Sequence, residues 1–467
     1  MSKRILSILL IFSMALSLNM NASKAFAANT STGFTFTSYA AKELLLAESY
    51  GLLPESWYEL DMTKEITKKQ LTTLIGNIRK KLKATNQVLI TSESLSLTST
   101  LTVEQVLTYY YKLIGGYKFK TVIGLKGKTV LGFMKENNIY TEAKGEQKLK
   151  EKCSIEQASI FATRLITCIY NKMGVASKGF LWKGSLGGNT IYLLGTIPYS
   201  SYSIYPISNT VLEALQKSEV IATENNQSNI KNLYQLIEYA VYTDGSSLKD
   251  HISAETYQEV IKLAIEFGVT EDIIRGYKPW FVSLLITSFQ TSKFNNKVIE
   301  SEINKTNINS FLLNYAQYSN KSVVDMETGK KKSEIFDKLS PELLEYILEQ
   351  TIDAYFDTEG ATQAVKDQKL LLENWKKGDA QSYLKYLQNK ELLSNNNSDE
   401  AVKLLLEEFK VNYTDYRNNE FAVYIDGLMK KKGSKTYFIM LDITQFTSGS
   451  SILDLLKVKG YSFTQVK

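Results

Sequence analysis

The chain has 467 residues, with 55 Lys and Arg against 49 Asp and Glu and a formal net charge of +6 at pH 7. A charge this close to balance gives no indication of a nucleic-acid-binding surface, which needs basic side chains gathered on one face. The single histidine, His251, excludes catalytic triads and metal sites built from several histidines, because imidazole is the usual base and zinc ligand in them.

The first 27 residues are typical of a secretory signal peptide. Lys3 and Arg4 precede an apolar run over residues 5–18, and Ala-Phe-Ala at residues 25–27 forms a small-x-small cleavage site. The run has about 14 residues, fewer than the roughly 20 that span a bilayer. We therefore predict cleavage before Ala28 and an extracellular product, secreted or associated with the cell wall, that has no transmembrane segment. Without these residues the formal charge falls to about +3.

Residues 36–173 contain a repeated helical pattern. A predicted helix ending at Gly51 is followed by one capped by Thr67, and a helix ending at Asn138 is followed by one capped by Ser154, with the same spacing in both copies. Thr102 opens a further related helix between them. Each hydroxyl cap is followed three positions later by a glutamine, which predicts a capping box at each helix start.

This tandem resembles S-layer homology repeats, whose second helix begins with an Ile-Thr-Arg-x-Glu type motif. The resemblance implies an all-α domain over residues 28–175 that holds an exported protein on cell-wall polymer through residues 36–173. The cation that follows the hydroxyl in that motif is present once, as Lys68, and is replaced by Val103 and Ile155 in the other copies. Two interpretations stay open: polymer binding and a helical spacer.

The chain has two cysteines and one histidine, so the role of each can be considered separately. Cys153 and Cys168 flank one predicted helix, about 22 Å apart along its axis and beyond disulfide reach, so we interpret both as small buried hydrophobic residues. His251 lies between Asp250 and the expected N-cap Ser253, where a solvated loop residue is favoured over a catalytic one.

From residue 180 the pattern changes to short strands separated by long amphipathic helices. Residues 180–183 and 190–194 are β-rich and are joined through Gly187 and Gly188, which predicts a hairpin. Further strands are expected at residues 219–223, 322–326, 436–443 and 461–466. The alternation predicts an α+β domain over residues 176–467, with helices packed on an α/β-type sheet.

A series of short motifs spread over residues 180–467 occurs in the order of a known family. They are Phe180-Leu181-Trp182-Lys183, Asn189 to Ile197, Tyr205-Pro206, Glu224, Lys278-Pro279-Trp280, Met326-Glu327-Thr328, Arg417-Asn418 and Gly460-Tyr461. On these motifs the region resembles the TraB/GumN family, which includes the Tiki-type metal-dependent proteases. The resemblance implies a metal-dependent peptidase site.

Both positions where that family carries its metal-binding histidines differ here. Pro198 follows Gly195-Thr196-Ile197, and Gln445 ends the run that begins at Asp442. Proline has no side-chain donor or acceptor, and a neutral amide is a poor ligand for a transition metal. We therefore expect no cofactor.

The family-site carboxylates and cation are retained as Glu224, Glu327 and Arg417. The alternative to an empty site is a divalent ion held by Glu224, Glu327 and Asp442. Each of these residues also has a purely structural interpretation. Glu224 is then a solvated carboxylate, Arg417 an ion-pairing residue, and Trp182 and Trp280 are core anchors.

Three functions follow from this pattern. The leading hypothesis is an exported, catalytically silent domain that binds an unknown peptide or protein ligand, or acts as a scaffold, at the cell wall. The alternative is a divalent-metal-dependent hydrolase in which Glu224, Glu327, Asp442 and Gln445 bind the ion. The third is a structural wall protein without a ligand.

Overall fold

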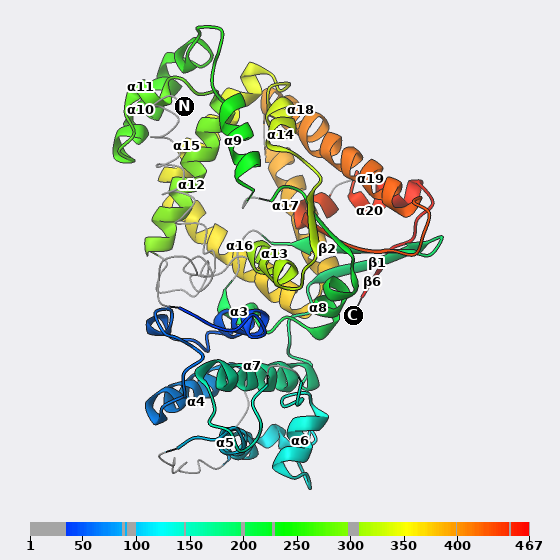
Figure 1. Ribbon diagram of the computed structural model, residues 1–467. Helices are drawn as coiled ribbons and strands as arrows, with labels where there is room; N and C mark the ends of the chain where they lie inside the picture. The colour runs from blue at the N-terminus through cyan, green and yellow to red at the C-terminus, as the bar shows by residue number, and fades with distance from the viewer. Residues whose placement is uncertain are drawn as a thin grey trace.

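A computed structural model of the chain describes residues 34–85, 89–90, 100–143, 146–197, 201–226, 229–297, 308–397, 399–447 and 450–466. It confirms the predicted α+β class: a six-stranded mixed sheet is surrounded by helices, and the region before it is helical (Figure 1). The predicted signal peptide and Pro198 lie outside the described residues, and those predictions stay predictions.

The N-terminal region forms the lower body in Figure 1. The central helix α7 (Ile155–Lys172) packs against α3, α4 and α5, and its apolar stripe is fully buried. The remaining helices are α3 (Ala41–Ser49), α4 (Lys68–Lys83), α5 (Val103–Gly115) and α6 (Val130–Glu136).

The three predicted hydroxyl caps are all present. Thr67 and Thr102 each form a complete capping box with the glutamine three residues later. Ser154 caps α7, but the predicted box there is not closed, because Gln157 accepts a hydrogen bond from the backbone N–H of Gln147 and Gln147 accepts one from that of Ser154. The side chain of Gln147, in the loop before α7, thus takes the place that Gln157 would have in a closed capping box.

The segments leading into these helices pair with one another. The backbone N–H of Ile66 donates to the carbonyl of Cys153 at 2.9 Å, and that of Cys153 donates to Leu101 at 2.8 Å. Cys153 is fully buried at this junction, as predicted, whereas Cys168 is only partly buried and its Sγ lies 3.5 Å from the Asn137 Oδ1. Both cysteines are free thiols.

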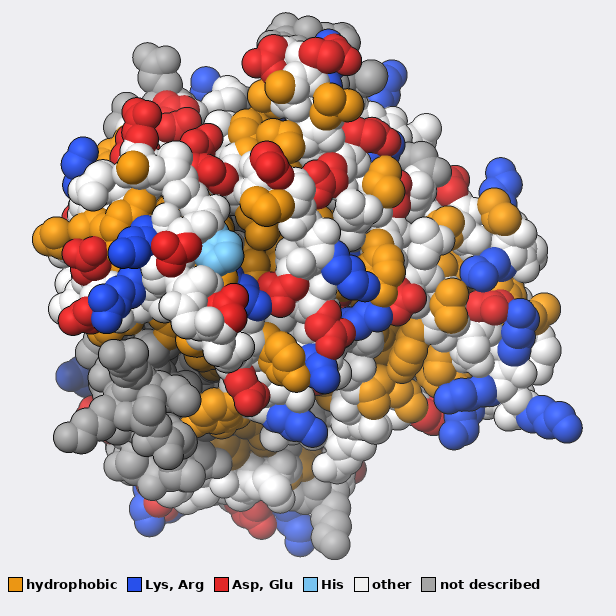
Figure 2. All heavy atoms as spheres, turned by 90° about the horizontal axis from the view of Figure 1, so that it is seen from above, with side chains coloured by type: hydrophobic (Ala, Val, Ile, Leu, Met, Phe, Trp, Pro, Cys, Tyr) orange, Lys and Arg blue, Asp and Glu red, His pale blue; other side chains and the backbone are white. Residues whose placement is uncertain are grey.

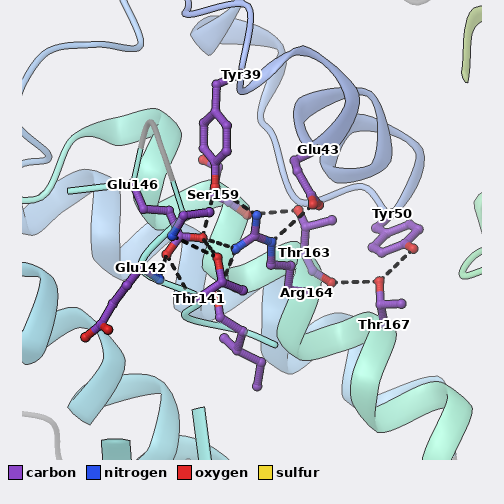
Figure 3. A network of polar contacts seen from close by, with 12 residues as sticks. Tyr39, Glu43, Tyr50, Thr141, Glu142, Glu146, Ser159, Thr163, Arg164 and Thr167 are labelled. Carbon is purple, nitrogen blue, oxygen red and sulfur yellow. Dashed lines mark hydrogen bonds and ion pairs between the residues drawn. The ribbon is translucent and has the colours of Figure 1, made fainter. Parts of the chain in front are cut away.

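A partly buried ion network also holds this region together (Figure 3). The Arg164 guanidinium donates to the carboxylates of Glu43 and Glu146 and to the Tyr39 hydroxyl. The Glu146 side chain is 0% exposed and accepts further bonds from the hydroxyl and the backbone N–H of Thr141. The network therefore joins α3, α7 and the loop after α6.

The sheet has strand order β4-β3-β5-β2-β1-β6. The four strands β2 to β5 are parallel; β1 pairs antiparallel with β2, and the edge strand β6 pairs antiparallel with β1. The predicted hairpin joins β1 and β2 through Gly187 and Gly188, both with positive φ. The strands are β1 (Phe180–Leu186), β2 (Asn189–Thr196), β3 (Val220–Thr223), β4 (Ser322–Asp325), β5 (Thr436–Asp442) and β6 (Thr464–Gln465).

Helices cover the sheet on both faces, and one apolar core contains the sheet, these helices and the N-terminal region. Trp182, a predicted core anchor, is 5% exposed in it. The covering helices are α8 (Asn209–Lys217), α13 (Ile308–Tyr318), α16 (Thr358–Lys377), α17 (Ala380–Asn397), α19 (Tyr416–Met429) and α20 (Ile452–Val458).

A second apolar core lies in the upper helices of Figure 1. Trp280 stacks there on Phe336, with ring centroids 5.0 Å apart, and is 1% exposed, which confirms it as a core anchor. The helices are α9 (Ile230–Tyr239), α10 (Ala254–Glu266), α11 (Glu271–Ile274), α12 (Pro279–Lys297), α14 (Gly329–Phe336) and α15 (Pro341–Phe356), with α18 (Glu400–Phe409) packed on α15.

His251 lies on the surface of this upper part, as the sequence predicted. Its ring stacks on Tyr242 at 4.4 Å and its Nε2 lies 2.9 Å from the Ser246 hydroxyl. The view from above in Figure 2 shows this imidazole in pale blue at the surface.

The N-terminal region and the sheet domain also share polar contacts. The Lys81 ammonium, 8% exposed, donates to the carbonyl of Tyr202 at 2.8 Å. The backbone N–H of Asn209 donates to Asn171 Oδ1 at 2.9 Å, and α3 packs on α13. The segment after β2 is thus held by the helical region. Within the described residues, no helix combines the length and the apolar character that a membrane crossing requires.

Candidate functional site

Several residues proposed for the site lie at one edge of the sheet, among them Glu224, Glu327 and Asp442. Strands β2 to β5 run in parallel, so their carboxyl ends lie together, with Thr196 opposite Asp442 and Thr223 opposite Asp325. Glu224 directly follows β3, and Glu327 follows β4 by two residues. Ligands of open parallel sheets bind at this edge.

Arg417 joins the two glutamates. Its Nε and Nη2 donate to the two carboxylate oxygens of Glu327 at 2.8 and 3.0 Å, and Nη2 also donates to Glu224 Oε2 at 2.9 Å. The side chains of Arg417 and Glu327 are 6% and 4% exposed, whereas Glu224 retains 18%. Glu224 is therefore the side of this cluster that solvent reaches.

An irregular helix positions the guanidinium. Between α18 and α19 the chain forms a π-helical turn over Lys410–Asp415, and Arg417 is the second residue of α19, which begins directly after that turn. The rings of Tyr413 and Phe421 each lie 5.2 Å from the guanidinium carbon. Such turns occur often at functional sites, since the extra residue redirects the side chains that follow it.

Backbone bonds fix the carboxylates. The N–H of Glu327 donates to the carbonyl of Glu224 at 2.8 Å, and the N–H of Asp442 donates to Glu224 Oε1 at 2.6 Å. The amide of Asn225 donates to the Glu327 carbonyl at 3.0 Å. Both oxygens of Glu224 and both of Glu327 thus accept hydrogen bonds from the protein itself.

Sequence reasoning missed the residue that holds the loop after Glu224. Asp325, at the end of β4, accepts the backbone N–H of Asn226 at 2.6 Å and the side-chain amides of Asn229 and Asn232, each at 2.8 Å. The available signal was the density of asparagine over residues 225–232, together with an acid at the end of a predicted strand.

The charges of the cluster are unevenly compensated. Burial raises the pKa of Glu224 above its usual value, against the attraction of Arg417, and the neighbouring charge of Asp442 adds to the rise. Burial also raises the pKa of Asp442, against hydrogen bonds from Thr444 and the charge of Arg417. The cluster therefore holds its negative charge less easily than free carboxylates do.

Gln445 lies three residues after Asp442, on a short 3₁₀ helix, Ile443–Phe446, which Asp442 caps by accepting the backbone N–H of Thr444 at 2.9 Å. It is 4% exposed, and its Oε1 has no hydrogen-bond partner in the described part of the chain. The next residue, Phe446, stacks on Trp182, with ring centroids 4.5 Å apart.

This donor set suits a transition metal poorly. The carboxylate oxygens of Glu224 and Glu327 are engaged by Arg417 and by the backbone, and Gln445 offers a neutral amide. Over the described ranges, no group of three or more His, Cys, Asp and Glu is arranged to hold an ion.

A family model with the description TraB/PrgY/gumN family matches residues 180–465. The chain belongs to the TraB/PrgY/gumN family. The match begins at the first residue of β1 and ends at the last residue of β6, so the TraB/PrgY/gumN region is the sheet domain with all of its inserted helices. Comparisons with curated proteins and with solved structures gave no match.

Proposed function

We propose that the chain is an exported member of the TraB/PrgY/gumN family whose family site is catalytically silent and serves in binding or scaffolding at the cell wall. The observation that carries this proposal is the position of Arg417. Its guanidinium occupies both oxygens of Glu327 and one of Glu224, which are the carboxylates that an ion would need.

The chemistry of the other positions supports the same function. Metal-dependent hydrolysis needs an ion that keeps enough positive charge to acidify its bound water. Neutral imidazole ligands allow this, but Pro198 and Gln445 stand where the family resemblance expects histidine. A site without them retains polar groups for recognition and lacks the means to generate hydroxide near neutral pH.

The competing function is a divalent-metal-dependent peptidase that uses Glu224, Glu327 and Asp442. It is favoured by the position of these acids at one sheet edge, where Arg417 pairs with both glutamates and the backbone N–H of Asp442 donates to Glu224. Peptide cleavage measured with added zinc, manganese or cobalt separates the two functions. The silent domain shows no cleavage above background, whereas the peptidase loses its cleavage in Glu224→Ala.

Cell-wall attachment is the part of the proposal that concerns residues 36–173. This region contains more Lys and Arg than Asp and Glu, and Lys68 and Lys69 are exposed in the first turn of α4. Exposed cations at this place suit an anionic wall polymer.

Sedimentation of the full chain with purified cell-wall sacculi tests the attachment. The Lys68→Gln, Lys69→Gln double variant is expected to leave more protein in the supernatant, while Lys457→Gln, Lys459→Gln, which removes two exposed lysines near the end of α20, is expected to bind like the wild type. Equal binding of both variants and the wild type would leave the spacer function for this region.

A further inference from the structure

The family site contains an excess of acceptors over donors. Arg417 pairs with Glu224 and Glu327, and a third acid, Asp442, adjoins Glu224 by donating its backbone N–H to Glu224 Oε1 at 2.6 Å, so three acidic residues are grouped around one guanidinium. Burying negative charge without full compensation is unfavourable unless a further cation or a proton is supplied. The cluster as folded therefore suits a positively charged ligand.

A second observation, independent of the carboxylates, also indicates a ligand that donates hydrogen bonds. Gln445 is 4% exposed and its Oε1 accepts no hydrogen bond in the described part of the chain. Gln445 lies in the single turn of the 3₁₀ helix that Asp442 caps, three residues after it, so the two residues belong to the same short segment of the sheet edge. A buried acceptor without a partner destabilises a fold, and such groups are retained where a ligand satisfies them.

We propose that Glu224, Asp442 and Gln445 form a binding site for a primary ammonium group, such as the free amino terminus of a peptide or an amino-bearing side chain. This rests on the proposed function, because a site occupied by a catalytic metal has no room for it. An ammonium group offers three N–H donors and no acceptor, which matches a site composed of three acceptor side chains. Glu224, with 18% of its side chain exposed, is the point of entry.

The surroundings of Asp442 suit the carbon atoms attached to such a nitrogen. Trp182 stacks on Phe446, the last residue of the 3₁₀ helix. Tyr383 stacks on Phe180, the first residue of β1, with ring centroids 6.1 Å apart. Aromatic rings next to carboxylates favour organic cations over hydrated metal ions.

The test is a titration of the full chain with butylammonium chloride at pH 7, followed by ligand-observed NMR, with butanol as the uncharged probe. A ligand of this size is expected to bind with a Kd of roughly 1 mM, and butanol at least about tenfold more weakly. Asp442→Asn, which keeps the oxygen that caps the 3₁₀ helix, and Gln445→Met, which keeps the shape, are each expected to raise the Kd about tenfold.

Two controls separate binding from structural damage. Asp244 accepts the backbone N–H and the hydroxyl of Ser246 as Asp442 accepts those of Thr444, so Asp244→Asn is the matched variant and should bind like the wild type. Gln445→Met should unfold at the same or a higher temperature than the wild type, because it removes a buried oxygen that has no partner.

Equal binding of butanol and butylammonium, no binding of either, or an unchanged Kd in Gln445→Met would each overturn the ammonium site. A parallel titration with Mn²⁺ distinguishes this from failure of the proposed function. Tight Mn²⁺ binding accompanied by peptide cleavage refutes both proposals. If neither butylammonium nor Mn²⁺ binds and no peptide is cleaved, the ammonium site alone is refuted.

Discussion

Arg417 and Glu327 form a two-pronged ion pair in which Nε and Nη2 each donate to a different carboxylate oxygen, at 2.8 and 3.0 Å. The two residues are 90 positions apart in the sequence and are both almost fully buried. The pair fastens the start of α19 to the segment that follows β4. A planar guanidinium makes both bonds at once, which a lysine ammonium cannot do.

Replacement of Arg417 by lysine should therefore destabilise the fold. Because Glu327 would remain buried with an incomplete partner, we expect the free energy of unfolding to fall by about 3 kcal/mol. Chemical denaturation measures this. Lys430→Gln breaks the more exposed pair with Asp426 and should change the stability by less than about 1 kcal/mol. Equal effects in the two variants would show that the Arg417 pair does not anchor α19.

The raised pKa of Asp442 predicts a pH dependence of stability. A carboxyl whose pKa is raised in the folded state destabilises the fold when it is ionised. The free energy of unfolding therefore falls as the pH rises from 3.8, the ordinary pKa of an aspartate, through the raised pKa of Asp442. Asp442→Asn removes this loss. We expect the variant to match the wild type near pH 3 and to exceed it at pH 7 in denaturant unfolding. A variant less stable than the wild type at pH 7 would refute the buried-charge interpretation.

Glu146 predicts the opposite pH dependence. Burial acts to raise its pKa, but the hydrogen bonds from Arg164 and Thr141 outweigh burial and the pKa is lowered (Figure 3). Its stabilisation is present above the ordinary value of 4.5 and is lost as the pH falls through the lowered pKa. Glu146→Gln should therefore lower stability at pH 7, by about 3 kcal/mol, and much less near pH 3. A pH-independent loss would point to packing as its cause.

The shared core predicts that the helical region and the family domain unfold together. Lys81 donates across their boundary to the Tyr202 carbonyl, and Lys81→Met should lower the unfolding free energy by about 1–2 kcal/mol, since that carbonyl loses its charged donor. Lys83→Met, at an exposed position of the same helix, is the control. Calorimetry should show the helical region and the sheet unfolding in one transition, which Lys81→Met shifts as a whole; a separate transition for the helical region would contradict the shared core.

Local patterns predicted much of the fold. The helix caps at Thr67 and Thr102, the β1–β2 hairpin and the strands before Glu224 and Glu327 were predictable, because each depends on neighbours within a few residues. The order of the family motifs also indicated Glu224, Glu327 and Arg417 as candidate site residues, and these three form one ion-pair cluster.

Local patterns did not predict the hydrogen-bond partners that are distant in the sequence. Arg417 donates to both carboxylate oxygens of Glu327 only because of how α19 packs in the fold. The π-helical turn before α19 contributes to this position, and no residue spacing in the sequence predicts that turn. The open box at Ser154 likewise reflects Gln147, a loop residue that outcompetes the local partner Gln157. Competition between local and distant hydrogen-bond partners is decided only in the folded chain.

The metal content of the purified full chain is the most direct test of the silent site. We expect no stoichiometric zinc, manganese or cobalt in the wild type after incubation with each ion, and a gain of bound metal in the Pro198→His, Gln445→His double variant, which restores imidazole at both family positions. One tightly held ion per chain in the wild type, with peptide cleavage that Glu224→Ala abolishes, would contradict the silent site and establish the peptidase.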